Sequence, residues 1–322
     1  MGKIIYNKIS ILIVNFNTAK LVNNLVNSIE EHNSGFQYEV IIVDNDSQDE
    51  DIRILKNLEQ RKNVKVIFSK QNLGFGKANN LAFHHSSGNF IVLLNPDTLL
   101  IENSLQKVLN FRLTLNRPAI IGIRLVLEDG SWQKSKLMFP NLTNALSQAF
   151  FLDSIFKGSE IFDRVYYGWQ SDSETCQVDF VRGAFMFMDR EIFEKLNGFD
   201  EDYFLYTEEA DLCYRAWQLG IPVWYYPETK IIHLESQSMK IDRRFTWIEL
   251  YRSQILFMKK HHGRFQSFCF RLVLALSAFN RIILNSILAI FKQKRFFYEK
   301  SLIYFYSLLW LLGIPLIVKK PE

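Results

Sequence analysis

The N-terminal third of the chain alternates short β-branched apolar runs with segments of helical period. The expected strands are Ile9–Val14, Val40–Val43, Val64–Phe68 and Phe90–Leu94. The expected helices that follow them are Ala19–Glu31, Asp49–Gln60, Gly76–Ser86 and Glu102–Leu115. Strand–helix units in succession are typical of a parallel sheet covered by helices. The sequence therefore predicts an α/β fold.

Polar residues and glycines follow each expected strand directly. They are Asn15-Phe16-Asn17, Asp44-Asn45-Asp46, Asn72-Leu73-Gly74-Phe75-Gly76 and Asn95-Pro96-Asp97. Ligands of parallel α/β sheets bind beyond the carboxyl ends of the strands, so these segments are the first candidates for a site. Neither a G-x-G-x-x-G after the first strand nor a G-x-x-x-x-G-K-[ST] occurs, which argues against dinucleotide dehydrogenases and P-loop enzymes.

The middle of the chain is less regular. It contains an Asp129-Gly130 turn signal and a predicted strand over Val178–Met188. A Gly198-Phe199-Asp200 turn and an acidic helix start follow. Two paired extended segments are expected at Val223–Tyr226 and Lys230–His233.

Two aspartates and one histidine are candidates for chemistry, and each also has a structural interpretation. Asp97 ends an apolar strand, where a carboxylate could hold a divalent cation on a diphosphate, although Asn-Pro-Asp is also a common turn. Asp44 could accept a hydrogen bond from a nucleotide base or ribose, or could belong to an N-cap cluster. His233 could be a metal ligand, while a lone histidine is more often structural.

The segment Glu208-Glu209-Ala210-Asp211 opens a predicted helix. Acidic residues in a first turn are favoured by the helix dipole, and three carboxylates exceed what capping requires. One of them could therefore act as a general base. Glu208 and Glu209 project about 100° apart on a helix, so only one can face a given atom. Asp211 is expected either to cap the helix or to pair with Arg215 at i+4.

Positive charge and apolar length gather at the C-terminal end. From His261 to Glu322 there are nine Lys and Arg against two acidic residues, although the whole chain carries only +4. Apolar stretches cover Phe265–Phe291 and Ser301–Val318, and in the first of these Ser267, Arg271, Ser277, Arg281 and Asn285 fall on one side of a helix. We expect this tail to lie on an anionic membrane surface rather than to bind nucleic acid; a core or dimer-interface role is the alternative.

Taken together, these segments resemble the family 2 glycosyltransferases, and among them the rhamnosyltransferase-like enzymes of bacterial surface-polysaccharide assembly. The segments that carry the resemblance are Ile13–Asn17, Val43–Ser47, Asn72–Gly76 with Asn79-Asn80, Leu94–Asp97, Asp129–Ser131, Arg182–Ala184, Gly198–Glu201, Tyr206–Cys213 and His233. Two positions depart from the pattern. Asn95 replaces the first acid of the usual Asp-x-Asp, and Glu209 stands where aspartate is commoner.

The resemblance implies a GT-A fold, a Rossmann-like mixed sheet flanked by helices, and inverting transfer from a nucleotide-sugar. It implies that Asp97 and His233 hold Mg²⁺ or Mn²⁺, and that Glu209 is the base with Glu208 beside it. Asp44 would contact the base of the nucleotide. The donor-binding residues implied are Asn15, Asn17, Asp44, Asn45, Asn72, Gly74, Gly76, Asn79 and Asn95. Those implied for the acceptor or its loop are Arg182, Gly183 and Asp211.

The resulting expectation is a catalytic domain over residues 1–246, with a nucleotide-sugar half to about 118 and an acceptor half from about 119. A helical membrane-associating region over 247–322 follows. The favoured reaction moves L-rhamnose from dTDP-L-rhamnose onto a lipid-linked saccharide. A UDP-hexose or UDP-galactofuranose transferase is the alternative within the class, and a non-catalytic membrane-bound sugar-nucleotide or polysaccharide-binding protein is the alternative outside it.

The expected location is the cytoplasmic face of the bacterial inner membrane, bound peripherally or through a C-terminal re-entrant segment. The three cysteines share no CxxC spacing, which favours free thiols in a reducing compartment. A homo-oligomer is also possible.

Overall fold

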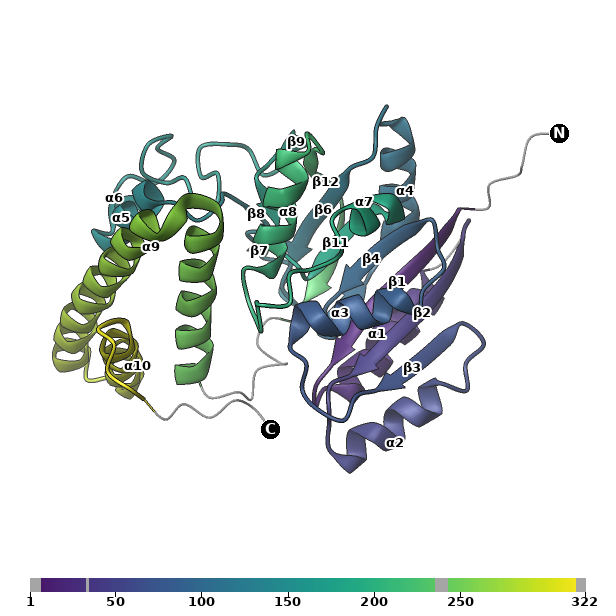
Figure 1. Ribbon diagram of the computed structural model, residues 1–322, viewed down its shortest axis with the longest axis horizontal. Helices are drawn as coiled ribbons and strands as arrows, with labels where there is room; N and C mark the ends of the chain where they lie inside the picture. Colours follow the sequence, from purple (N-terminus) through teal and green to yellow (C-terminus); the bar gives the residue numbers. More distant parts are fainter. Residues whose placement is uncertain (1–6, 33–34, 235–242, 317–322) are drawn as a thin grey trace. The chain divides into compact units, whose positions relative to one another are not determined.

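The computed structural model describes residues 7–32, 35–234 and 243–316 (Figure 1). These residues form two compact units. The first comprises the described residues up to 137 together with 171–204 and 208–234, and the second comprises 138–170, 205–207 and 243–316.

The first unit is built on a mixed sheet. Its parallel half has the order β3-β2-β1-β4 and contains β1 (Lys8–Asn15), β2 (Gln37–Asp44), β3 (Val64–Phe68) and β4 (Phe90–Leu94). The sheet continues from β4 through β11 (Phe185–Asp189), β6 (Ile120–Val126), β12 (Val223–His233) and β5 (Thr98–Leu100). Strand β11 runs antiparallel to β4 and β6, and β12 runs parallel to β6. The four predicted strands are confirmed, each within three residues at either end.

Helices cover both faces of this sheet. They are α1 (Ala19–Glu31), α2 (Asp49–Leu58), α3 (Phe75–His84), α4 (Ser104–Thr114), α7 (Arg190–Lys195) and α8 (Glu208–Gln218). Alternate residues of β1 (Ile9, Ile11 and Ile13) share a core with α1, α2 and α4. Successive strand side chains point to opposite faces, so α3, α7 and α8 cover the other face. Figure 1 shows α3 and α7 in front of the sheet.

Two strand predictions need correction. The predicted strand Val178–Met188 is divided between β10 (Phe180–Val181) and β11, because the chain changes partner after Val181, and β9 (Cys176–Gln177) precedes it. Strand β10 pairs with β8 (Lys136–Leu137), whereas β11 pairs with β4. The two extended segments before His233 are one strand, β12, whose register shifts between Tyr226 and Lys230. Pro227 lies within this shift and has no N–H to give to the ladder.

A buried ion pair links α4 to the start of α7. The Arg112 guanidinium donates to both carboxylate oxygens of Asp189, at 2.6 and 2.8 Å, and the Ala119 N–H donates to the same carboxylate at 3.1 Å. Both side chains are about nine-tenths buried.

We expect Arg112→Leu to destabilise the protein by about 3 kcal/mol, because it leaves the Asp189 carboxylate buried without its counter-charge. The control is Lys20→Ala, which breaks an exposed ion pair with Glu50 and should cost below about 1 kcal/mol. Urea unfolding followed by circular dichroism compares the two variants. Equal midpoints for both would contradict the assignment.

The second unit is helical. It contains α5 (Leu142–Ala149), α6 (Leu152–Ile155), α9 (Arg243–Lys292) and α10 (Arg295–Leu311). Gly263, with φ 88° and ψ 169°, interrupts α9 and divides it into a more polar and a more apolar helix. The predicted apolar stretch from Ser301 overlaps α10, and its last two residues, 317 and 318, lie outside the described part of the chain.

The segment 138–170 lies in a different unit from the one that the sequence predicts. The sequence assigned it to the acceptor half of the catalytic domain, whereas it forms one unit with the tail helices. The Phe139 ring stacks on Phe257 with centroids 6.0 Å apart. Asn280 and Arg281 of α9 donate to the carbonyls of Ala149 and Gln148 at 3.0 and 3.3 Å. These contacts between distant parts of the sequence leave no local signal.

The arginines expected to help bind the membrane surface instead make contacts inside the second unit. Arg271 donates to the carbonyls of Leu311 and Trp310 at 2.6 and 3.3 Å, which satisfies the C-terminus of α10. Arg281 donates to Ser277 of its own helix and to α5. The predicted polar stripe is therefore directed into the second unit, because unpaired helix carbonyls need donors, and an apolar face points outward.

Candidate active site

The carboxyl ends of β1 and β2 are joined by a buried polar network. The Asn15 amide donates to Asp44 Oδ1 at 2.7 Å and to Ser47 Oγ at 3.0 Å, while its oxygen accepts from Thr18. The other oxygen of Asp44 accepts from the Ser47 N–H. Asn15 and Asp44 are both fully buried, so Asn15 fixes the position of the Asp44 carboxylate. Contact between Asp44 and a nucleotide base stays a prediction.

The loop between β3 and α3 is fastened to the end of β2. Asn45 donates to the Gly74 carbonyl at 2.9 Å and accepts from the Leu73 N–H, and Asn72 accepts from the Gly74 N–H. Gly74 has φ 82°, and a Cβ there would lie 2.3 Å from the Phe204 carbonyl oxygen. Only glycine fits this position. Asn17, with φ 55°, closes the opposite rim by accepting from the Gln48 N–H.

Helix α3 joins this loop to the turn that contains Phe199. Asn80 donates to the Phe199 carbonyl at 2.9 Å and accepts from its N–H at 2.8 Å. Asn79 is bonded to the Phe75 carbonyl within the helix. A Cβ on Gly76 would lie 3.0 Å from Phe199. Of the predicted donor residues, Asn79 and Gly76 thus make structural contacts, and a donor contact from either stays a prediction.

Asp97 and His233 lie together although 135 residues separate them in the sequence. Asp97 Oδ1 is 3.3 Å from His233 Nε2, and the two side chains are only 2% and 9% exposed. The antiparallel pairing of β5 with β12 creates this contact, because His233 lies opposite Thr98. The Leu234 N–H donates to the Asp97 carbonyl at 2.8 Å and closes the pair.

This pair fits a divalent cation. Two neighbouring ligands about 2.1 Å from an octahedral ion lie about 3 Å apart, close to the distance between the Asp97 and His233 atoms. Among the described residues no group of three or more His, Cys, Asp or Glu side chains could hold an ion. Mg²⁺ is commonly bound by one or two protein ligands with phosphate oxygens and water completing the shell.

Glu208 and Glu209 begin α8 and face different neighbours. Glu208 is buried, and its Cβ lies 3.8 Å from where a Cβ on Gly76 would be. Glu209 is half-exposed, and its Cβ lies 3.9 Å from the corresponding position on Gly183. Tyr206 and Thr207, immediately before the helix, both have positive φ, near 69°. Such backbone strain in two successive non-glycine residues is characteristic of functional sites.

The loop that contains Gly183 lies near Glu209 and is hydrogen-bonded to the residue that follows β4. The Ala184 carbonyl accepts from the Asn95 N–H at 3.2 Å, and Asn95 lies two residues before Asp97. Arg182 is held away from this contact, because its Nε donates to the Lys134 carbonyl at 2.6 Å. The Cβ of the half-exposed Glu209 therefore lies near the loop whose Ala184 carbonyl is bonded to Asn95.

Asp211 has the contacts of a structural group. Its carboxylate accepts from Arg215 Nε at 2.7 Å, which confirms the predicted i+4 pair, and Arg215 in turn donates to the carbonyls of Leu196 and Gly198. The Tyr203 hydroxyl donates to the other oxygen at 3.4 Å. Burial, reinforced by this carboxylate, raises the pKa of Tyr203, so the hydroxyl stays a donor.

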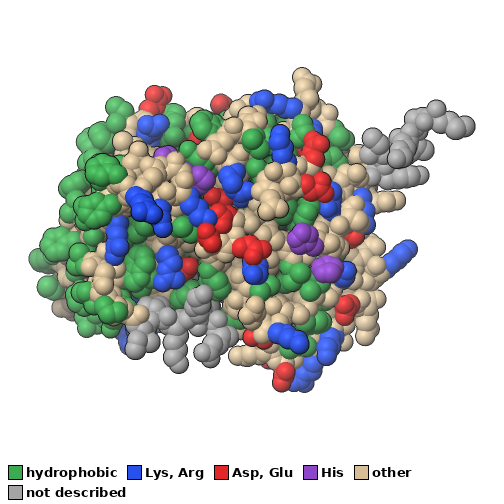
Figure 2. Space-filling model, in the orientation of Figure 1, with side chains coloured by type: hydrophobic (Ala, Val, Ile, Leu, Met, Phe, Trp, Pro, Cys, Tyr) green, Lys and Arg blue, Asp and Glu red, His purple; other side chains and the backbone are tan. Residues whose placement is uncertain are grey.

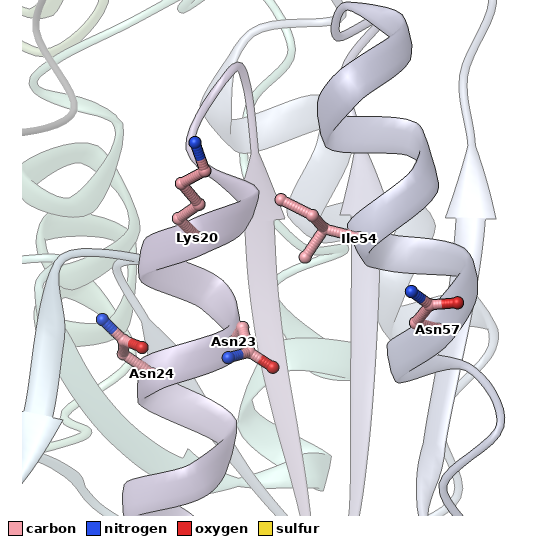
Figure 3. A pocket seen from close by; sticks show the side chains of 5 residues that line it. All are labelled: Lys20, Asn23, Asn24, Ile54 and Asn57. Carbon is pink, nitrogen blue, oxygen red and sulfur yellow. The ribbon is translucent and has the colours of Figure 1, made fainter.

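A hollow lies elsewhere on the first unit. It has a volume of about 470 Å³, and the residues that line it come from α1 and α2: Lys20, Asn23, Asn24, Ile54 and Asn57 (Figure 3). None of the predicted site residues lines it. Figure 3 shows Lys20 directed away from the groove between the two helices and Ile54 directed into it. This hollow is not the candidate active site.

Sequence reasoning missed two residues that build the site. Gln133 Oε1 lies 2.6 Å from His233 Nδ1, and Ser47 Oγ bridges Asn15 and the Asn17 N–H. Ser47 lies within a segment already singled out, so its position was a usable signal. Gln133 has no such signal, because its role depends on strand pairing between distant segments.

Two solved glycosyltransferase structures share this fold. The mannosyltransferase PcManGT of Pyrobaculum calidifontis, solved with GDP-Man and Mn²⁺, has a TM-score of 0.59, is 13% identical, and matches over 94% of this chain and 86% of its own. GalNAc-T7, solved with UDP, GalNAc and Mn²⁺, has a TM-score of 0.54, is 13% identical, and matches over 78% of this chain and 48% of its own. The predicted GT-A fold is confirmed.

Residues 10–196 match glycosyl transferase family 2, and the chain belongs to this family of glycosyltransferases. The rhamnosyltransferase WbbL of Escherichia coli is 28% identical over 239 residues, which cover 71% of this chain and 83% of WbbL. The N-acetylglucosaminyl-diphospho-decaprenol L-rhamnosyltransferase of Mycobacterium tuberculosis is 23% identical over 235 residues, which cover 70% of this chain and 75% of that protein.

Proposed function

We propose that the protein is an inverting, metal-dependent glycosyltransferase that moves L-rhamnose from dTDP-L-rhamnose onto a lipid-linked saccharide. The observation that carries this proposal is the Asp97–His233 pair after the end of β4, near the Gly183 loop toward which the Glu209 Cβ lies. Two relatives that are rhamnosyltransferases by name support the choice of sugar. The decaprenol-linked diphosphate in the name of one of them supports a lipid-linked acceptor.

In this proposal some residues bind the donor and the ion, and one residue transfers the proton. Asp97 and His233 would hold the ion, which when bound supplies positive charge to the departing diphosphate. The network around Asp44 and Asn45 holds the strand ends and the Gly74 loop rigid beneath the nucleotide. Glu209 accepts the proton of the acceptor hydroxyl as that oxygen attacks the anomeric carbon. One displacement without an enzyme nucleophile inverts the configuration.

Selection among donors is the experiment that tests this proposal. A ligand that binds the native state raises its melting temperature. We expect dTDP-L-rhamnose with Mn²⁺ to give the largest increase in a panel that includes UDP-glucose, UDP-galactose and UDP-galactofuranose. If a UDP-sugar raises the melting temperature more, the UDP-hexose or UDP-galactofuranose alternative replaces dTDP-L-rhamnose as the donor. No increase with any nucleotide-sugar would contradict it.

The second unit supports attachment to a membrane surface. Eight exposed apolar side chains of α9 after Gly263 recur every three or four residues: Phe265, Phe268, Leu272, Leu276, Phe279, Ile283, Ile287 and Ile290. Leu284 and Phe291 are exposed beside them. Helix α10 adds Phe296, Leu302 and Phe305. Figure 2 shows hydrophobic side chains gathered over the part of the molecule that contains these helices. We call this set the apolar stripe. A one-sided stripe suits a helix that lies in the membrane interface.

Length and burial of α9 agree with this proposal. Among the described residues α9 is the one helix long and apolar enough to cross a membrane, and only 22% of its most apolar window is buried. A core helix of a water-soluble protein would be mostly buried. Lys292, Lys294 and Arg295 lie between the α9 and α10 parts of the apolar stripe and are exposed, so they can contact anionic headgroups. The cytoplasmic face of the inner membrane is the proposed location, because nucleotide-sugars are cytoplasmic.

We expect the triple variant Leu272→Glu, Leu276→Glu and Phe279→Glu to lose most co-sedimentation with vesicles that contain anionic lipid, because it places three charges in the apolar stripe. The control carries Leu113→Glu, Trp217→Glu and Leu219→Glu at similarly exposed positions of the first unit. It should bind as the wild type does. High salt should weaken wild-type binding only in part. Undiminished binding by the stripe variant would contradict the proposal.

A further inference from the structure

The His233 ring is held between two side chains. Gln133 Oε1 lies 2.6 Å from its Nδ1, and Asp97 Oδ1 lies 3.3 Å from its Nε2. Gln133 and His233 are both buried, so little water reaches these two contacts. The two ring nitrogens thus face groups of different chemistry, an amide and a carboxylate.

These contacts determine which nitrogen carries the proton. A neutral imidazole has one N–H, and an amide oxygen can only accept. With Gln133 Oε1 at Nδ1, the proton is on Nδ1 and the lone pair of Nε2 is directed toward Asp97. A metal ion binds that lone pair and not an N–H. Without an acceptor at Nδ1, the Asp97 carboxylate would favour the opposite tautomer, in which Nε2–H donates to it.

The β6–β7 hairpin delivers Gln133 to this place. Strand β7 (Trp132–Gln133) pairs antiparallel with β6, and Gln133 lies opposite Leu125. Leu125 in turn lies opposite Ile231 of β12, two residues before His233. The turn of the hairpin is the Asp129-Gly130-Ser131 segment, in which Gly130 has φ 77° and the Ser131 N–H donates to the Asp129 side chain. This turn sets the register that brings Gln133 to the histidine.

We propose that Gln133 is a positioning residue for metal binding, which holds His233 in the Nδ1–H tautomer so that Nε2 can ligate the ion. This inference rests on the proposed metal site of Asp97 and His233. Within the described part of the chain, the buried Gln133 Nε2 has no hydrogen-bond partner. Leaving a buried amide N–H group unsatisfied costs free energy of folding. A role for the amide oxygen in holding His233 explains why a glutamine stands at this position.

The test is Mn²⁺ affinity of the full chain, measured from free Mn²⁺ by EPR with Mn²⁺ alone and with dTDP added. Gln133→Met keeps the size of the side chain and removes the acceptor, and it should weaken Mn²⁺ binding about 10- to 100-fold. Gln133→Glu keeps an acceptor at Nδ1 and should stay within a few-fold of the wild type. Gln177→Met, at an exposed position of β9, is the control and should change nothing.

The tautomer itself gives a second readout. In protein labelled with ¹⁵N-histidine, the His233 signal, assigned by its loss in His233→Ala, should show a protonated Nδ1 in the wild type and in Gln133→Glu. In Gln133→Met it should show a protonated Nε2.

The outcomes separate this inference from the metal site on which it rests. If His233→Ala binds Mn²⁺ as tightly as the wild type, the metal site is wrong. If His233→Ala binds more weakly but Gln133→Met does not, the metal site stands and the role of Gln133 is overturned. Equal losses in Gln133→Met and Gln133→Glu would also overturn it, because they would indicate packing alone.

Discussion

Glu209→Gln should retain donor and metal binding and lose most of kcat, about 10²-fold or more. A glutamine amide cannot take the proton of the acceptor hydroxyl, and loss of a general base costs about this much. The Cβ of the half-exposed Glu209 lies 3.9 Å from where a Cβ on Gly183 would be, whereas its neighbour Glu208 is buried near Gly76 of α3. Steady-state kinetics at saturating donor and acceptor, with donor affinity measured separately, checks this expectation.

Glu208→Gln is the matched control, since it removes a carboxylate one residue away on the same helix. The two side chains project about 100° apart, so the substitutions report on different directions from α8. Glu208→Gln should lower kcat much less than Glu209→Gln does. If Glu208→Gln proves the more damaging change while Glu209→Gln remains near wild type, the two roles must be exchanged.

Removal of either proposed metal ligand should abolish the dependence of donor binding on the ion. Asp97→Ala and His233→Ala should each bind the donor about 10²-fold more weakly in the presence of Mn²⁺, because the diphosphate then loses its counter-charge. Without added metal the two variants and the wild type should bind the donor equally weakly. Isothermal titration with and without EDTA measures both affinities.

Glu59→Ala provides a control for these variants, since it removes an exposed carboxylate at the C-terminal end of α2 and no proposed ligand. It should leave the effect of EDTA on donor affinity intact. Wild-type protein that binds the donor equally well with and without EDTA would overturn the metal assignment of Asp97 and His233.

The N-terminal strands could be predicted because their signal is local. Each expected strand is a short β-branched run, and burial of that run on both faces of the sheet requires the apolar residues that make it recognisable. The strand ends then gather Asn15, Asp44 and Asp97 on one edge without further information. The position of His233 beside Asp97 required the pairing of β5 with β12, which no local pattern encodes.

In the tail, helical periodicity alone does not predict which way the polar side of α9 faces. Helical spacing correctly groups Ser267, Arg271 and Ser277 on one side of α9. It cannot decide whether that side faces water or protein. Here the free carbonyls at the end of α10 need donors, and Arg271 supplies them, so the polar side faces inward. Contacts of this kind depend on the folded unit and cannot be read from one helix.

Transfer of the sugar itself tests the central claim most directly. The full chain, dTDP-L-rhamnose, Mn²⁺ and a lipid-diphosphate-linked N-acetylglucosamine would be incubated with anionic vesicles and the lipid product analysed by mass spectrometry and NMR. We expect the acceptor to gain one deoxyhexosyl residue whose anomeric configuration is inverted relative to the donor, and Glu209→Gln to yield almost none. A product with retained configuration, or a wild-type protein that binds dTDP-L-rhamnose but transfers no sugar, would contradict the account.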